Sequence, residues 1–217
     1  MELSRLYDRH QAGQLLADRL TQLADASPGW VIALPRGGVP VGYEIAQRLQ
    51  WPLDIWLVRK LGVPDQPELA MGAIAAPNTQ ILNQALIERL GVTPEQIHKT
   101  VQAELQELQR RDRRYREGRP LPNIGGRPVI LVDDGVATGA TFQAAIAAIK
   151  AFQPLSVTAV APVVAPESWQ TLSEQVDATL CLLAPTAMGS ISQWYEHFDA
   201  VGDRTVIDLL KASRSRS

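Results

Sequence analysis

The feature that most constrains the fold is a repeated change from short apolar runs to longer segments with helical periodicity. The apolar runs lie at 30–34, 53–58, 129–132, 155–164 and 178–184, and the helical patterns at 14–24, 41–49, 93–117, 142–152, 167–175 and 204–212. Strands that alternate with helices favour right-handed crossovers and a mostly parallel sheet with helices on both faces. We therefore predict an α/β, Rossmann-like fold, in which ligands bind beyond the carboxyl ends of the strands.

The remaining segments predict loops and minor strands. The glycine and proline content of 59–69 indicates a loop, while 71–76 and 79–82 favour two short strands that form a hairpin. We expect one domain over 1–217, with a small C-terminal hood built from about 185–217.

Composition excludes several classes of protein. Among 217 residues, 46% are hydrophobic and 20% are charged, which is ordinary for an α/β domain, and the net charge of −2 does not favour nucleic acid or an anionic membrane. The single cysteine, Cys181, excludes an internal disulfide and fits a reducing compartment. No segment predicts a signal peptide or a membrane span, so we expect a cytoplasmic protein without nucleic-acid or membrane partners.

The stretch VILVDDGVATGATF carries the clearest functional signal. A buried strand ends in Asp133 and Asp134 and is followed by small residues, with hydroxyls at Thr138 and Thr141. A strand-to-helix loop of this kind leaves backbone N–H groups uncovered, and the helix that follows adds the positive end of its dipole. The stretch therefore predicts a phosphate-binding loop.

The two acids require a separate explanation. Adjacent carboxylates suit the vicinal hydroxyls of a ribose, so a 5-phosphosugar would place its phosphate on 137–141 and its diol on Asp133 and Asp134. The alternative is the capping of a helix N-terminus, worth ~1 kcal/mol, but capping needs only one acid. The Walker pattern and the G-x-G-x-x-G spacing of dinucleotide folds are both absent.

The strand, the two acids and the following A-T-G-x-T resemble the signature of type I phosphoribosyltransferases, which bind 5-phosphoribosyl 1-pyrophosphate (PRPP). DRHQAGQLLADRL, RKLGVPDQPELAMGAIA and WYEHFDAVGD look like a branch of bacterial predicted phosphoribosyltransferases, so the resemblance spans nearly the whole chain. It implies the type I fold, a homodimer and a role in nucleotide salvage. It also implies Mg²⁺-dependent transfer of the phosphoribosyl group from PRPP to a nucleobase-like acceptor, a purine, with release of pyrophosphate.

The family has a second loop, which follows the first core strand and holds the pyrophosphate, and PRGG at 35–38 lies at that place. Arg36 would meet the pyrophosphate by charge, and Gly37 and Gly38 would bring backbone N–H groups close to it. Many members contain a non-proline cis peptide here, which predicts a cis bond between Pro35 and Arg36. A plain tight turn is the alternative.

A mobile catalytic loop is the third element that the resemblance implies. Arg59 and Lys60 stand where this loop begins, and 61–72 would form the lid. In 6-oxopurine members a third aspartate stands where this chain has Ala137, so Glu68 in the lid is the candidate general base. Solvated charges at a strand end and in a loop are the alternatives.

The resemblance thus implies a full set of site residues. The PRPP-binding residues are Pro35, Arg36, Gly37, Gly38, Arg59, Lys60, Asp133, Asp134, Gly135, Val136, Ala137, Thr138, Gly139, Ala140 and Thr141; the catalytic residues are Arg36, Lys60, Glu68, Asp133 and Asp134. Trp194 and Tyr195 are candidates for stacking on the acceptor base, with packing or a dimer contact as alternatives. Mg²⁺ would be bound through PRPP, not directly by protein side chains.

Two other functions stay open at this point. A regulator could retain the PRPP pocket as a sensor without transferase activity, and a protein of the same fold could process another phosphosugar. The basic run RRDRRYREGR at 110–119 suggests nucleic-acid binding, but acids at helical spacing explain it as a solvated, internally paired helix. A subunit interface, or arginines that reach the pyrophosphate, would be the next interpretations of this run.

If the hydroxyl of Thr141 bonds the phosphate, Thr141→Ala should weaken PRPP binding by ~1–2 kcal/mol. Isothermal titration with PRPP and Mg²⁺ measures this change directly. An unchanged affinity would reject the assignment of this loop as the phosphate-binding site.

Overall fold

The computed structural model describes residues 4–21, 28–77 and 79–215, with the side chain of Glu68 also outside the description. The chain divides into two compact units. The first unit comprises Met1–Ile55, Pro122–Gly139 and Phe152–Ser217, and the second comprises Trp56–Leu121 and Ala140–Ala151. The single domain expected over 1–217 stays a prediction.

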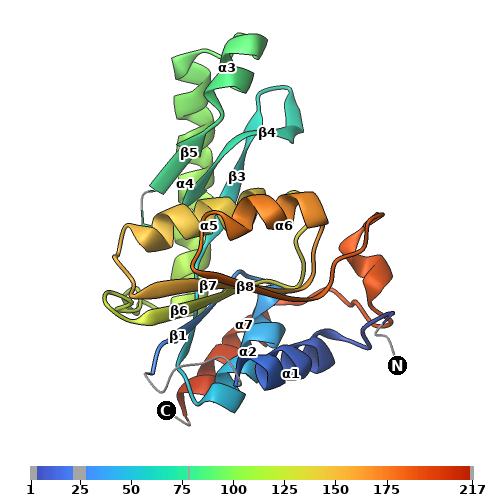
Figure 1. Ribbon diagram of the computed structural model, residues 1–217. Helices are drawn as coiled ribbons and strands as arrows, with labels where there is room; N and C mark the ends of the chain where they lie inside the picture. Colours follow the sequence, from blue (N-terminus) through green and yellow to red (C-terminus); the bar gives the residue numbers. More distant parts are fainter. Residues whose placement is uncertain (1–3, 22–27, 78, 216–217) are drawn as a thin grey trace. The chain divides into compact units, whose positions relative to one another are not determined.

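The first unit is built on a parallel five-stranded sheet. Its strands, in spatial order, are β2 (Leu53–Ile55), β1 (Trp30–Ala33), β6 (Pro128–Val132), β7 (Ser156–Val163) and β8 (Ala178–Leu183). Helices α1 (Arg9–Leu20) and α2 (Gly38–Leu49) cover one face, and α6 (Pro166–Ser173) lies on the other (Figure 1). Helix α7 (Asp203–Arg214) packs beside α2 and β2. The predicted α/β class with helices on both faces of a parallel sheet is confirmed.

The pairing of β1 with β6 sets the position of both predicted ligand loops. Ala33 lies opposite Val132 in the parallel register, and one residue later the N–H of Leu34 donates to the carbonyl of Val132 at 2.8 Å. Both strands therefore end at the same edge of the sheet, with their following loops side by side.

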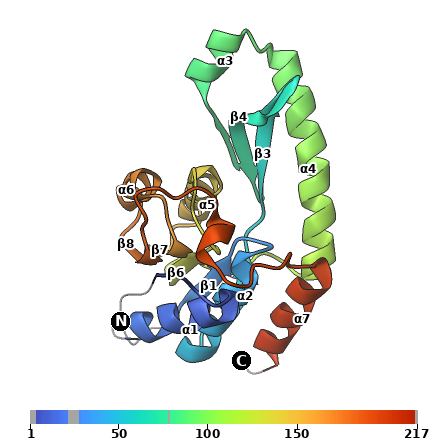
Figure 2. The same cartoon turned by 90° about the vertical axis from the view of Figure 1, so that its right-hand side faces the viewer.

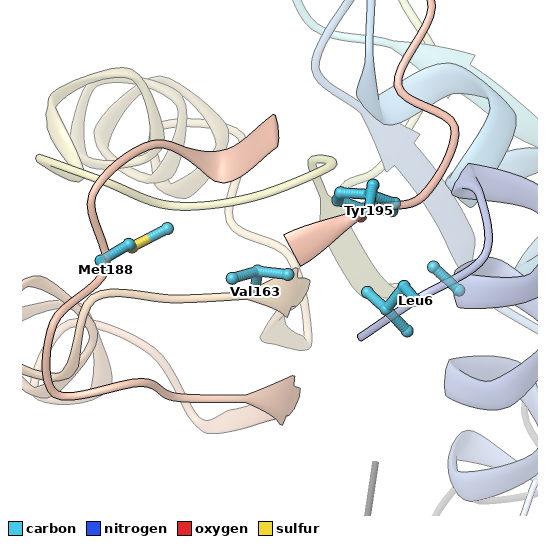
Figure 3. Packing of buried hydrophobic residues seen from close by; sticks show 5 residues of the cluster. Leu6, Val163, Met188 and Tyr195 are labelled. Carbon is cyan, nitrogen blue, oxygen red and sulfur yellow. The ribbon is translucent and has the colours of Figure 1, made fainter. Parts of the chain in front are cut away.

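A small apolar cluster joins the two ends of the first unit. It consists of Leu6, Ala12, Val163, Met188 and Tyr195, all nearly inaccessible to solvent (Figure 3). Leu6 also forms an isolated parallel bridge with Tyr195, which follows the 3₁₀ helix η1 (Ile191–Trp194). The expected hood segment is thus anchored to the beginning of the chain and to the end of β7.

The second unit contains an antiparallel sheet of β3 (Val58–Val63), β4 (Gln66–Ala75) and β5 (Thr79–Leu82), with β4 in the middle. Its helices are α3 (Gln84–Leu90), α4 (Pro94–Arg116) and α5 (Ala140–Lys150). Helix α4 runs alongside β3 and β4 (Figure 2), and α5 packs against all three strands of this sheet.

The structure overturns the predicted loop at 59–69 and the strand at 53–58. The apolar run 53–58 breaks at Trp56, because β2 ends at Ile55 in one sheet and β3 begins at Val58 in the other. Residues of the expected loop pair as β3 and β4, with register shifts on both sides of Gly62. Gly and Pro signalled a loop here, but a bulge and a tight turn accommodate them within a hairpin.

Three smaller differences concern element ends and edges. Helix α1 begins at Arg9 rather than at 14, since the Asp8 side chain accepts from the N–H of Gln11, and 22–24 lies outside the described residues. Helix α3 was not predicted at all. Strand β8 was predicted as buried, but it forms an edge of the sheet and its side chains are half-buried or exposed.

The long helix α4 follows its sequence signals closely. The Thr93 hydroxyl accepts from the N–H of Gln96, and the Gln96 side chain accepts in return from the N–H of Thr93, which completes the predicted capping box. In the basic run, Arg110 and Arg111 both bond Glu107 and together lower its pKa to about 2. The intrahelical pairing expected for this run is confirmed.

Among the helices of the described residues, none has the length and apolar character of a membrane span.

We expect Thr93→Ala to lower the free energy of unfolding by ~1 kcal/mol, because the substitution leaves a helix N–H without its side-chain acceptor. Thr100→Ala is the matched control on the same helix, since the Thr100 hydroxyl donates to the carbonyl of Gln96 within that helix. Urea unfolding followed by far-UV circular dichroism measures both. Equal stability of the two variants would contradict the capping role.

Candidate functional site

The first loop of the site follows β1 and contains the predicted PRGG sequence. The peptide bond between Pro35 and Arg36 is cis, as the family resemblance implied. The N–H of Gly38 donates to the carbonyl of Leu34 at 3.1 Å, and α2 begins at Gly38. The loop is therefore a compact turn that leads directly into a helix.

The acidic pair follows β6 at the same edge of the sheet. Asp134 accepts a hydrogen bond at 2.7 Å from the Nε of Arg9, and both side chains are largely buried. The Asp133 carboxylate accepts from the backbone N–H of Asp134 at 2.9 Å. Neither carboxyl group is a freely solvated side chain in the ligand-free protein.

Gly37 and Asp134 are in direct contact, which joins the two loops. A Cβ atom added at Gly37 would collide with the carboxylate of Asp134. A Cβ at Gly38 would lie 2.8 Å from the Cα of Asp133 and 2.7 Å from the carbonyl oxygen of Val132. Glycine is required at both positions because the acidic loop occupies the space of a side chain.

The rest of the acidic loop is held by hydrogen bonds to the segment that follows β7 and to α6. Val136 bridges to Val164 of the segment that follows β7, and the Ala137 carbonyl accepts from the Ser168 hydroxyl at 2.7 Å. Gly139 has a φ of +75°, a conformation that favours glycine. Within the described part of the chain, the backbone N–H groups of 137–139 have no hydrogen-bond acceptor outside regular structure.

This loop continues into α5, which begins at Ala140. The first N–H groups of a helix lack intrahelical acceptors, so α5 also begins with backbone donors. Ala137, Thr138 and Thr141 are exposed to solvent. Such an arrangement can bind an oxyanion.

Asp133 has an unusual electrostatic environment. Burial, and then the neighbouring carboxylate of Asp134, raises the pKa of Asp133 well above its usual range, against the opposing hydrogen bond from the Asp134 N–H. The Tyr195 phenol, also buried and close to Asp134, likewise has a raised pKa. The surroundings of Asp133 and Tyr195 therefore disfavour the negatively charged forms of these two side chains.

The charged residues predicted to contact the pyrophosphate or the acceptor lie outside the acidic loop. Arg36 lies 3.7 Å from the carboxylate of Asp203, at the start of α7, and its side chain is half exposed. In the second unit, Arg59 and Lys60 lie within β3, and Arg59 donates to Glu104 at 2.6 Å. Position 68 is part of β4, and the Glu68 side chain lies outside the description. The expected lid at 61–72 is therefore a β-hairpin; the roles of these residues stay predictions.

The aromatic pair of the tail has a packing role. Tyr195 is 1% exposed, and its hydroxyl donates to the backbone carbonyl of Asp134 at 2.7 Å. The Trp194 indole donates to the carbonyl of Met188 at 2.8 Å. Packing was one of the alternatives for this pair, and it describes Tyr195 well; base stacking by Trp194 or Tyr195 stays a prediction.

Sequence reasoning missed Arg9, the charged partner of Asp134. The available signal was weak, since Arg9 stands among polar residues in DRHQAG, ahead of the helix predicted at 14–24. The structure places Arg9 in the first turn of α1, where a cation is unfavourable, but the helix was predicted only from residue 14, so the sequence did not show this position.

Metal-ligating side chains do not gather at this site. In the ranges that the structure describes, no group of three or more His, Cys, Asp or Glu residues could hold a metal ion. The donors at the acidic loop are hard carboxylate oxygens, which suit an oxygen-rich Mg²⁺ complex brought by a ligand.

Comparison with known proteins decides the family. The family model described as "Phosphoribosyl transferase domain" matches residues 3–187. The chain belongs to the phosphoribosyl transferase domain family. A Mycobacterium tuberculosis protein named "Putative phosphoribosyl transferase Rv0571c" is 39% identical over 203 residues, which cover 94% of this chain and 46% of that protein. The counterpart MT0597 in strain CDC 1551 matches equally. The chain thus spans about half the length of the curated relatives that it matches.

A solved structure agrees with this assignment. The crystal structure of TT1426 from Thermus thermophilus is 36% identical to the chain, with a TM-score of 0.82 over 95% of this chain and 97% of that one. Family membership and the five-stranded parallel sheet together confirm the predicted type I phosphoribosyltransferase fold.

The raised pKa of Asp133 predicts a pH dependence of stability. Because the folded state binds this proton more tightly than the unfolded state, stability from this group falls as pH rises from about 4, the usual carboxyl pKa, through the raised pKa. Asp133→Asn should therefore stabilise the ligand-free protein at pH 8, and the gain should shrink toward pH 4. Urea unfolding midpoints at both pH values measure this, and a gain that is independent of pH would contradict the buried charge.

Proposed function

We propose that the protein is a Mg²⁺-dependent phosphoribosyltransferase that transfers the 5-phosphoribosyl group of PRPP to a nucleobase-like acceptor, a purine, with release of pyrophosphate. The observation that carries this proposal is the contact between Gly37 of the PRGG loop and the Asp134 carboxylate. One ligand that reaches both loops must offer an anion to each and a polar group between them, as PRPP does. Family membership supports phosphoribosyl transfer as the general activity.

The proposed binding mode assigns one part of PRPP to each loop. The 5-phosphate accepts from the exposed N–H groups of 137–141, and the ribose diol donates to Asp133 and Asp134. The pyrophosphate meets Arg36 and the backbone of Gly37 and Gly38. The half-exposed Arg36, 3.7 Å from Asp203, can turn toward a ligand at low cost because surface pairs of this kind contribute little.

The proposed chemistry needs positioning more than covalent catalysis. A nitrogen of the acceptor attacks C1 of the ribose, the bond from C1 to the pyrophosphate oxygen breaks, and its electron pair leaves with the pyrophosphate. Positive charge that develops on the ring is stabilised by the carboxylates of Asp133 and Asp134, and negative charge on the leaving group by Arg36. Mg²⁺ held by PRPP oxygens supplies further neutralisation of the leaving group.

The other parts of the proposal rest on sequence resemblance. Lys60 and Arg59 are proposed to contact the pyrophosphate, Glu68 to accept a proton from the acceptor, and Trp194 and Tyr195 to border the base. A homodimer, a cytoplasmic location and a role in nucleotide salvage belong to the same proposal. The single cysteine supports a reducing compartment.

Incubation of the protein with PRPP, Mg²⁺ and a panel of purine and pyrimidine bases tests the function. We expect pyrophosphate release with at least one base, and a rate lowered by about 100-fold or more in Asp134→Asn, because a charge that stabilises the transition state is lost. Asp18→Asn is the matched control, since Asp18 is well exposed on α1 and pairs with Arg48.

Two outcomes would change this proposal. Tight PRPP binding without turnover for any base would favour the PRPP-sensing regulator. An absence of PRPP binding by titration calorimetry would reject both functions and leave another phosphosugar as the ligand class.

A further inference from the structure

Asp134 is enclosed by groups from both ends of the first unit. Arg9 donates to its carboxylate from Nε and to the Asp199 carbonyl from an Nη atom at 2.8 Å. The Arg9 guanidinium lies over the Phe198 ring, 3.7 Å from the centroid. The Tyr195 hydroxyl donates to the Asp134 carbonyl, so the side chain and the backbone of Asp134 are each held by a hydrogen bond.

Burial of the Arg9 charge costs free energy unless a carboxylate compensates it. Arg9 is only 8% exposed, and arginine is rarely buried to this extent without a partner. It also stands at the first residue of α1, where the positive end of the helix dipole opposes a cation. The carboxylate of Asp134 compensates both effects, so the two side chains form one unit.

The pair of Arg9 and Asp134 also reduces the charge repulsion expected in the proposed binding mode. PRPP is a polyanion, and in the proposed binding mode it lies beside the adjacent carboxyl groups of Asp133 and Asp134. The Arg9 guanidinium contacts the Asp134 carboxylate, and Gly37 lies against the same carboxylate.

We propose that Arg9 is a positioning residue for phosphoribosyl transfer, which holds the Asp134 carboxylate against Gly37 and offsets its charge so that PRPP can bind beside the acidic pair. This role rests on the proposed function. It acts through Asp134 alone, without contact between Arg9 and the substrate.

A double-substitution experiment on the full chain tests the role, with the PRPP affinity measured by titration calorimetry in the presence of Mg²⁺. Arg9→Gln should weaken PRPP binding roughly 10- to 100-fold, the loss of one charge-assisted hydrogen bond to a carboxylate. Arg5→Gln is the matched control, because Arg5 donates to the Tyr195 carbonyl in the same region but does not contact Asp134. The control should change the affinity by less than about 3-fold.

The decisive comparison is made in the Asp134→Asn variant. If Arg9 acts through Asp134, adding Arg9→Gln to Asp134→Asn should leave the PRPP affinity unchanged within about 3-fold. A merely structural role for Arg9, in holding α1 and the tail, would weaken binding equally in both backgrounds. This pair of variants also removes both charges together, so it remains informative if Arg9→Gln alone does not fold.

The outcomes separate the two proposals. If the unsubstituted protein binds PRPP and Arg9→Gln binds it equally well, or if the loss is the same with Asp134→Asn, the positioning role of Arg9 is overturned and the function stands. If the unsubstituted protein does not bind PRPP, the proposed function is overturned together with this role.

Discussion

The parallel pairing of β1 with β6 is the constraint on which the rest of the site depends. The N–H of Leu34, one residue beyond the last pair of Ala33 with Val132, donates to the Val132 carbonyl at 2.8 Å. Because this bond fixes where both strands end, PRGG and the acidic loop begin side by side. Their packing is then so close that only glycine fits at 37 and 38.

The buried charged groups of this site lower the free energy of unfolding of the ligand-free protein. Burial and the neighbouring Asp134 raise the pKa of Asp133. Asp134 itself forms an ion pair with the buried Arg9. Groups that are costly in the free protein are typical of sites whose ligand offsets the cost. The tail, which is part of the first unit, contributes to this arrangement because Phe198 packs against Arg9 and Tyr195 bonds the carbonyl of Asp134.

Local sequence signals predicted the parts of this fold whose structure is decided locally. The strand before Asp133, the capping box at Thr93 and the cis bond after Pro35 all follow from short patterns or from family resemblance. The hairpin of β3 and β4 could not be predicted, because its glycines and prolines are tolerated through a bulge and a turn that depend on pairing between strands. The break at Trp56 and the pair of Arg9 with Asp134, 125 positions apart, depend on tertiary contacts that no local pattern carries.

The most direct measurement of the central claim is a crystal structure of the protein with PRPP and Mg²⁺. We expect density for the 5-phosphate over the N–H groups of 137–141, with the ribose hydroxyls at Asp133 and Asp134 and the pyrophosphate at PRGG. Density for PRPP at another place, or an acidic loop with no ligand beside it at saturating PRPP, would contradict the claim.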